Sequence, residues 1–137
     1  MLADDKKFGF VIVDGNGALF AYLQGSDKQI IQSIKVDLPK KHRKGGQSSV
    51  RFARIREEKR LTYLMKVAEL TNQHFITNDK PNIAGLVLAG NSAFKTELSE
   101  TPILDQRLKP CILSVLDISY GGENGLNEAI SLSSQAL

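Results

Sequence analysis

The chain has 137 residues, the size of one typical domain, with 42% hydrophobic and 24% charged residues. Such a chain can bury one sizeable core without disulfides or metals, and its composition excludes extensive disorder. The lone cysteine, Cys111, excludes an intrachain disulfide and fits a reducing compartment.

Positive charge is concentrated in one segment. The net charge of the chain is only +3, but residues 40–60 hold nine of the eighteen Lys and Arg against two acids, a local charge of +7 that leaves −4 for the remainder. Such asymmetry predicts a polyanionic partner that meets one end of an otherwise acidic body.

The first third of the chain predicts an antiparallel meander. Residues 8–14 form a β-branched, apolar run that ends in the hairpin-turn sequence Gly-Asn-Gly at 15–17. A second strand is expected at 18–24, and a turn at 25–27 leads into a third. In the third strand, alternation predicts one face with Ile30, Gln32, Ile34 and Val36 and another with Ile31, Ser33 and Lys35.

A loop and a long helix follow the meander. Residues 37–47 show neither helical nor strand periodicity, which indicates a loop. Residues 48–75 contain no Gly or Pro and many helix formers, so we expect a helix capped by Ser48 or Ser49.

The apolar stripe of this helix covers only its second half. Apolar and small residues recur there at spacings of three and four, as expected where a helix packs on a sheet. The stripe consists of Leu61, Leu64, Ala68, Thr71 and Phe75. Extended backwards, the same register meets Glu57, Arg54 and Val50, so the stripe fails. We therefore expect the first two or three turns to project from the body and to form, with the preceding loop, a protruding tip.

The remaining sequence alternates strands and helices. We expect strands at 83–89 and 111–118, a short helix through Leu98, a connector between Pro102 and Pro110, a loop at 120–125 and a closing helix from Leu126. The order βββαβαβα predicts a single α/β domain over residues 1–137. Its mixed β-sheet would be flanked by helices on both faces, in a ribonuclease H-like topology.

Two adjacent glycines occupy the predicted tip. Gly45 and Gly46 precede Gln47 in the middle of the basic segment. Glycines allow φ > 0 and remove Cβ bulk, so this backbone can enter a narrow cleft that other residues could not. A loop of eleven residues has a contour of about 36–40 Å, which is long enough for such an approach.

Gly-Gly-Gln and its surroundings resemble the class-1 peptide chain release factors of eukaryotes and archaea, whose universal signature is this tripeptide. The likeness to the family's middle domain runs through nearly the whole chain. It is carried by DLPKKH at 37–42, RFAR at 51–54, AGLVLAG at 84–90, FKTEL at 94–98, DQRL at 105–108 and DISYGGENG at 117–125.

The resemblance implies that the tripeptide enters the peptidyl-transferase centre of the ribosome and promotes hydrolysis of peptidyl-tRNA. The backbone N–H of Gln47, at the positive end of the following helix, would stabilise the developing oxyanion. The neutral Gln47 side chain would help to position or admit the water. Gln47 would also be methylated at N5 by a dedicated methyltransferase.

The resemblance also implies that the basic residues around the tip neutralise phosphates of rRNA or tRNA. The loop contributes Lys40, Lys41, His42, Arg43 and Lys44, and the helix contributes Arg51, Arg54 and Arg56. We expect His42 to stay neutral beside four cations and to contact RNA, and some of the helix arginines to pair with Glu57 and Glu58. His74, near a helix end, is expected to be structural.

Family proteins have three domains, and the likeness covers only the middle one. We therefore expect the stop-codon-reading domain and the C-terminal domain that binds the partner GTPase to be absent from this sequence. Activity would require the ribosome, so a free-standing enzyme is not expected. No cofactor or metal is expected either. The polar start at residues 1–7 and the lack of an apolar stretch of about 20 residues predict a cytoplasmic protein without a membrane contact, and we expect a monomer.

Two other functions remain open from the residues. A ribonuclease H-like outline would suit a metal-dependent nuclease with Asp14 and Asp117, although two-metal chemistry needs several converging carboxylates and no third acid has a claim. A noncatalytic RNA-binding or ribosome-binding module of the same architecture is the second alternative. The intact tripeptide argues against that module.

Overall fold

The computed structural model describes residues 6–36, 47–119 and 121–133, without the side chains of 47–49 and 52. Its elements follow the predicted order, with the addition of a hairpin of two short strands and a 3-10 turn. In chain order they are β1 (Lys7–Asp14), β2 (Gly17–Gln24), β3 (Asp27–Lys35), α1 (Gln47–Phe75), β4 (Ile76–Thr77), β5 (Lys80–Pro81), β6 (Gly85–Gly90), α2 (Phe94–Glu100), η2 (Lys109–Cys111), β7 (Ile112–Asp117) and α3 (Gly122–Ser133).

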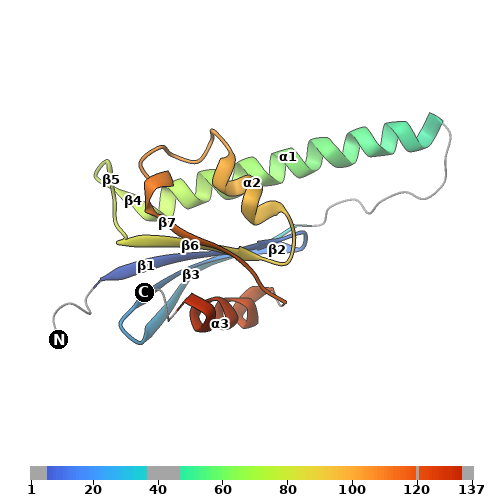
Figure 1. The fold of residues 1–137 in the computed structure, drawn as a ribbon. Helices are drawn as coiled ribbons and strands as arrows, with labels where there is room; N and C mark the ends of the chain where they lie inside the picture. Colours follow the sequence, from blue (N-terminus) through green and yellow to red (C-terminus); the bar gives the residue numbers. More distant parts are fainter. Residues whose placement is uncertain (1–5, 37–46, 120, 134–137) are drawn as a thin grey trace.

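Five strands form one mixed sheet in the order β3-β2-β1-β6-β7. The meander β1-β2-β3 is antiparallel, whereas β6 runs parallel to β1 and β7 runs parallel to β6. Helices α1 and α2 lie on one face of the sheet and α3 lies on the other (Figure 1). The predicted α/β class, the mixed sheet and the helices on both faces are confirmed.

The core has two layers, one on each face of the sheet. Side chains of β1 alternate between them: Val11 packs beneath α1, with Val67, while Ile12 packs beneath α3, with Leu126. A strand covered on both faces has no polar side, which explains the continuous apolar run at this point of the sequence.

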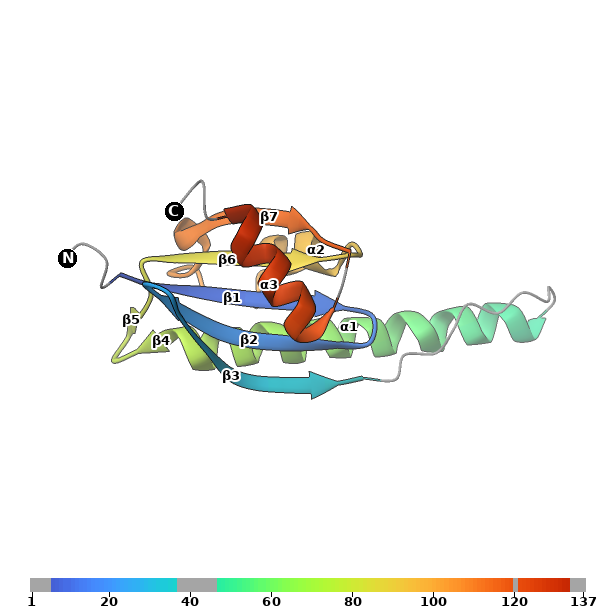
Figure 2. The same cartoon turned by 90° about the horizontal axis from the view of Figure 1, so that it is seen from below.

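Helix α1 docks only through its second half, as expected. The buried side chains of its docked face are Tyr63, Leu64, Val67, Ala68, Thr71 and Phe75. The expectation for Leu61 is wrong, because its side chain is 50% exposed. The docked face passes through positions 60, 64, 67 and 71, so the side chain of Leu61 lies beside that face and points towards solvent. Beyond this docked part, the start of α1 extends past the end of the sheet (Figure 2).

A β-bulge in β3 overturns the predicted faces of this strand. Phe20 pairs with Gln32 but Ala21 pairs with Ile30, so Ile31 is an extra residue. Ile31 therefore packs against the core beneath α1 together with Ile34 and Val36, whereas Ile30 is 40% exposed. Simple alternation places Ile30, and not Ile31, on the same face as Ile34 and Val36.

Several boundaries differ from the sequence-based expectations. Helix α1 begins at Gln47, so Ser48 and Ser49 lie inside its first turn instead of capping it. Helix α3 begins at Gly122, inside the predicted loop 120–125. Glu123 in its first turn suits the positive end of the helix dipole, and Gly125 is buried, so this glycine marks close packing and not a turn.

The small hairpin β4-β5 was not predicted as strands. Its turn residues Asn78 and Asp79 both have positive φ, 53° and 64°, as a two-residue hairpin turn requires.

Among the described residues, none of the helices has the length and the apolar character of a membrane-spanning helix.

Candidate functional site: the projecting start of α1

Residues 47–59 of α1, here called the tip helix, form the projecting part. Of the side chains described from Val50 to Lys59, none is buried, and Val50 is 63% exposed. The first backbone N–H groups of a helix lack intrahelical acceptors, and no acidic residue lies in the first turn of α1. The positive end of the helix dipole therefore has no compensating carboxylate within the first turn of α1 itself.

Part of the predicted site lies outside the described residues. These positions are Gly45 and Gly46 together with the loop cations Lys40, Lys41, Arg43, Lys44 and the neighbouring His42. Gln47 is the first residue of α1, so the tripeptide ends where the helix begins. The structure thus describes the helical base of the predicted site, and the roles of the tripeptide and the loop stay predictions.

The helix arginines lie along the tip helix. Arg51 and Arg54 are exposed and Arg56 is half-buried, and none of the three forms an ion pair with another described residue. The expected pairing of a helix arginine with Glu57 is found at Arg60, at 3.9 Å, and not at these three. Arg51 and Arg54 are three positions apart and so share one side of the helix near its start, an arrangement suited to phosphate groups, whereas Arg56 lies about 200° around the helix from Arg54.

An ion pair that was not predicted from the sequence joins α1 to α2 at the point where α1 begins to project. Both terminal guanidinium nitrogens of Arg60, Nη1 and Nη2, donate to the carboxylate of Glu97 in α2, with Nη1–Oε1 at 2.6 Å. These hydrogen bonds raise the pKa of Arg60, so the pair stays charged. Arg60 stood in a run of cations and Glu97 lies 37 positions further on, so no spacing rule connects them.

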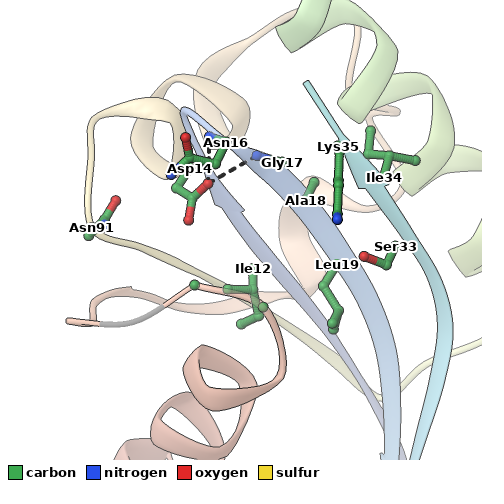
Figure 3. A pocket seen from close by; sticks show the side chains of 12 residues that line it. Ile12, Asp14, Asn16, Gly17, Ala18, Leu19, Ser33, Ile34, Lys35 and Asn91 are labelled. Carbon is green, nitrogen blue, oxygen red and sulfur yellow. Dashed lines mark hydrogen bonds between the residues drawn. The ribbon is translucent and has the colours of Figure 1, made fainter. Parts of the chain in front are cut away.

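The nuclease alternative fails on the geometry of its two carboxylates. Asp14 Oδ1 accepts the N–H groups of Asn16 and Gly17, at 2.8 and 3.0 Å, and so closes the β1-β2 turn (Figure 3). Asp117 is 92% exposed and pairs with Lys95 at 2.6 Å. Among the described residues, no three His, Cys, Asp or Glu gather where they could hold a metal ion.

A pocket beside Asp14 is lined by residues of opposite charge. It measures about 290 Å³ and is lined by backbone and side chains from the ends of β1, β2 and β3 and by the start of α3 (Figure 3). A carboxylate and Lys35 line the same space, so it has neither a pure anion-binding nor a pure cation-binding character.

His74 is held by the body, at the other end of α1 from the tip. Its ring packs against Phe20, with 5.4 Å between ring centroids, and Nε2 lies 2.6 Å from the Gln32 amide oxygen. Burial lowers its pKa, which favours the neutral ring. These contacts agree with the structural role expected for His74.

Comparison with known proteins identifies the family. Residues 7–137 match the family described as eRF1 domain 2, so the chain belongs to the eukaryotic class-1 release-factor family and corresponds to its second domain. Over all 137 residues it is 72% identical to the eukaryotic peptide chain release factor subunit 1 of Oxytricha trifallax and 56% identical to that of Dictyostelium discoideum. In both comparisons the chain spans 31% of the relative's length.

Solved structures agree on the fold. The archaeal translation termination factor aRF1 matches with a TM-score of 0.79 and 25% identity, over 96% of this chain and 35% of that one. The Pelota protein of Thermoplasma acidophilum matches with a TM-score of 0.63 at 10% identity, over 99% of this chain and 35% of that one. The second likeness shows the shared fold alone.

Proposed function

We propose that this chain is the domain of a peptide chain release factor that promotes hydrolysis of peptidyl-tRNA during translation termination. Family membership over residues 7–137 supports this function. The observation that carries it is the position of Gly45-Gly46-Gln47, whose last residue begins a projecting helix with no acidic residue in its first turn. The tripeptide would enter the peptidyl-transferase centre on this extended arm.

The proposed chemistry relies on the backbone of Gln47. Attack of water on the ester produces an oxyanion and a leaving ribose hydroxyl, and both are stabilised by a fixed hydrogen-bond donor. At the first position of α1, the N–H of Gln47 has no intrahelical acceptor and would serve as this donor. The Gln47 side chain is neutral and cannot act as a base, so its part is to position or admit the water. Positioning by ribosomal RNA replaces a catalytic triad.

The partners follow from this placement. The chain would bind large-subunit rRNA and peptidyl-tRNA through its loop cations, His42 and helix arginines, and a glutamine methyltransferase would modify Gln47 at N5. Stop-codon reading and binding of the partner GTPase belong to other domains of the longer protein. The domain would work in the cytoplasm, without cofactor or metal and only together with the ribosome.

The test is peptide release from programmed ribosomes by the full-length factor. Gln47→Gly frees the backbone at the helix start and removes the side chain that positions water. We expect near-normal ribosome binding and sharply slower release. Gln106→Gly, at an exposed glutamine of the connector, is the matched control and should release peptide at the normal rate. Unchanged release by Gln47→Gly would reject the part assigned to the Gln47 side chain, whereas absence of release by the unmodified factor would reject the proposed function and favour a noncatalytic ribosome-binding module.

A further inference from the structure

Helix α2 holds α1 where the tip helix leaves the body. The guanidinium of Arg60 binds the Glu97 carboxylate with two hydrogen bonds and also lies 4.5 Å above the centre of the Phe94 ring. That ring meets Tyr63 edge-on, with 5.2 Å between ring centroids. Two neighbouring positions of α1 are therefore held by two residues of α2.

Helix α2 is in turn fixed to the sheet. Lys95 is buried, and its ammonium group donates to the Ser92 carbonyl at 2.7 Å and to Asp117, at the end of β7, at 2.6 Å. Phe94 and Leu98 are buried in the core beneath α1. We call Arg60, Phe94, Lys95 and Glu97 the α2 bracket, because together they connect the sheet to the exit point of the helix.

Because the tip helix is long, a small change in its direction at the α2 bracket displaces its far end by several ångströms. Thirteen residue steps separate Arg60 from Gln47, which at about 1.5 Å per residue gives an arm of about 20 Å. Tilting that arm by about 10° displaces its end by about 3.5 Å at this rise per residue. A misplacement of about 1 Å at a reaction centre can cost about 10²-fold in rate.

We propose that Arg60, Glu97 and Phe94 are positioning residues that set the direction of the tip helix. By doing so they place Gly45-Gly46-Gln47 relative to the rest of the protein. The ion pair supplies two fixed hydrogen bonds at the exit point, and the aromatic ring fixes the plane of the guanidinium. The consequence for peptide release rests on the proposed function, whereas the direction of the helix does not.

The direction of the helix can be measured without the ribosome. Spin labels are placed at Arg54→Cys, in the tip helix, and at Gln29→Cys, in β3, in a Cys111→Ser background, and the distance distribution is recorded. We expect Arg60→Gln and Glu97→Gln to broaden or shift the distribution while helix content stays unchanged. The charge-swapped double variant Arg60→Glu/Glu97→Arg should return the distance distribution towards that of the unmodified chain. Arg107→Gln, which breaks the Arg107–Asp105 pair elsewhere, is the matched control. An unaltered distribution in both single variants would overturn the proposal.

Release assays with the longer factor test the consequence. The two single variants should release peptide more slowly at saturating factor, by 10-fold or more, with unchanged affinity for the ribosome, and the charge swap should restore part of the rate. A changed distance distribution with a normal release rate would overturn the positioning role. If the unmodified factor itself released no peptide, the proposed function would fail while the distance result would still stand.

Discussion

The hydroxyl group of Tyr63 donates a hydrogen bond of 2.8 Å to the backbone carbonyl of Asp14 and so joins α1 to the end of β1. Tyr63 is buried, and this burial, with the charge of Asp14 as a second cause, raises the pKa of its phenol. The phenol therefore remains a donor throughout the physiological range. The same carbonyl belongs to the residue whose side chain closes the β1-β2 turn.

Tyr63→Phe should destabilise the fold by about 1–3 kcal/mol, because a buried carbonyl loses its partner. Urea unfolding followed by circular dichroism measures the change. Thr62→Val is the control, since its hydroxyl bonds within an exposed helix turn and its loss should change the free energy of unfolding little. Equal effects of the two substitutions would contradict the link between α1 and β1.

Leu64→Ala and Leu61→Ala test which face of α1 docks. Leu64 is 7% exposed and its truncation should cost about 2–5 kcal/mol, through lost burial and the cavity left behind. Leu61 lies three positions earlier and is 50% exposed, so its truncation should cost less than about 1 kcal/mol. The reverse order in denaturant unfolding would show that the register described for α1 is wrong.

Much of this fold could be predicted because its signals are local. The polar face of the projecting turns and the apolar face of the docked turns follow from periodicity. The β-bulge at Ile31 could not be predicted, because it depends on how β3 pairs with β2. Leu61 was misplaced for a related reason: two adjacent stripes fit the same spacing, and only contact with the sheet selects between them.

The same distinction between local and distant signals applies to the candidate site. The tripeptide and the basic residues could be found from sequence because they are contiguous. Arg60 and Glu97 could not, since a pair of charges 37 positions apart leaves no periodic signal. Glycines of 121–125 indicated a loop, yet Gly121 and Gly125 allow close packing at the start of α3.

Gly121→Ala should destabilise the fold by about 1–3 kcal/mol, through overpacking at a site where the neighbours cannot move far. A Cβ at this position would lie 2.3 Å from Asp14 Oδ2, and that carboxylate is held by the turn. Gly15→Ala is the control, because its Cβ would have its nearest neighbour at 3.9 Å. Thermal unfolding of both variants measures the difference, and a neutral Gly121→Ala would contradict the close approach.

Asp105 should titrate well below an ordinary aspartate. Hydrogen bonds from the Arg107 side chain and backbone lower the pKa of Asp105 to about 2. A carboxyl with a depressed folded-state pKa stabilises the fold above its unfolded pKa of about 3.9, and this contribution is lost as pH falls towards 2. The pair lies at the surface, where solvent screens it, so this contribution should be small.

NMR titration of the Asp105 carboxyl measures this value directly. Arg107→Gln should bring the pKa back towards about 3.9, the value for an unperturbed aspartate. An unperturbed value in the unmodified chain would show that the Arg107 contacts do not persist in solution.

The central claim is that the tripeptide acts chiefly through the backbone N–H of Gln47, and Gln47→Pro compared with Gln47→Ala tests it most directly. Both variants lose the side chain, but only proline removes the N–H, and proline is well tolerated at the first position of a helix. Single-turnover peptide release by the full-length factor should be about 10²–10³-fold slower for Gln47→Pro than for Gln47→Ala, the usual effect of losing one oxyanion donor. Equal release rates for the two variants would contradict the account.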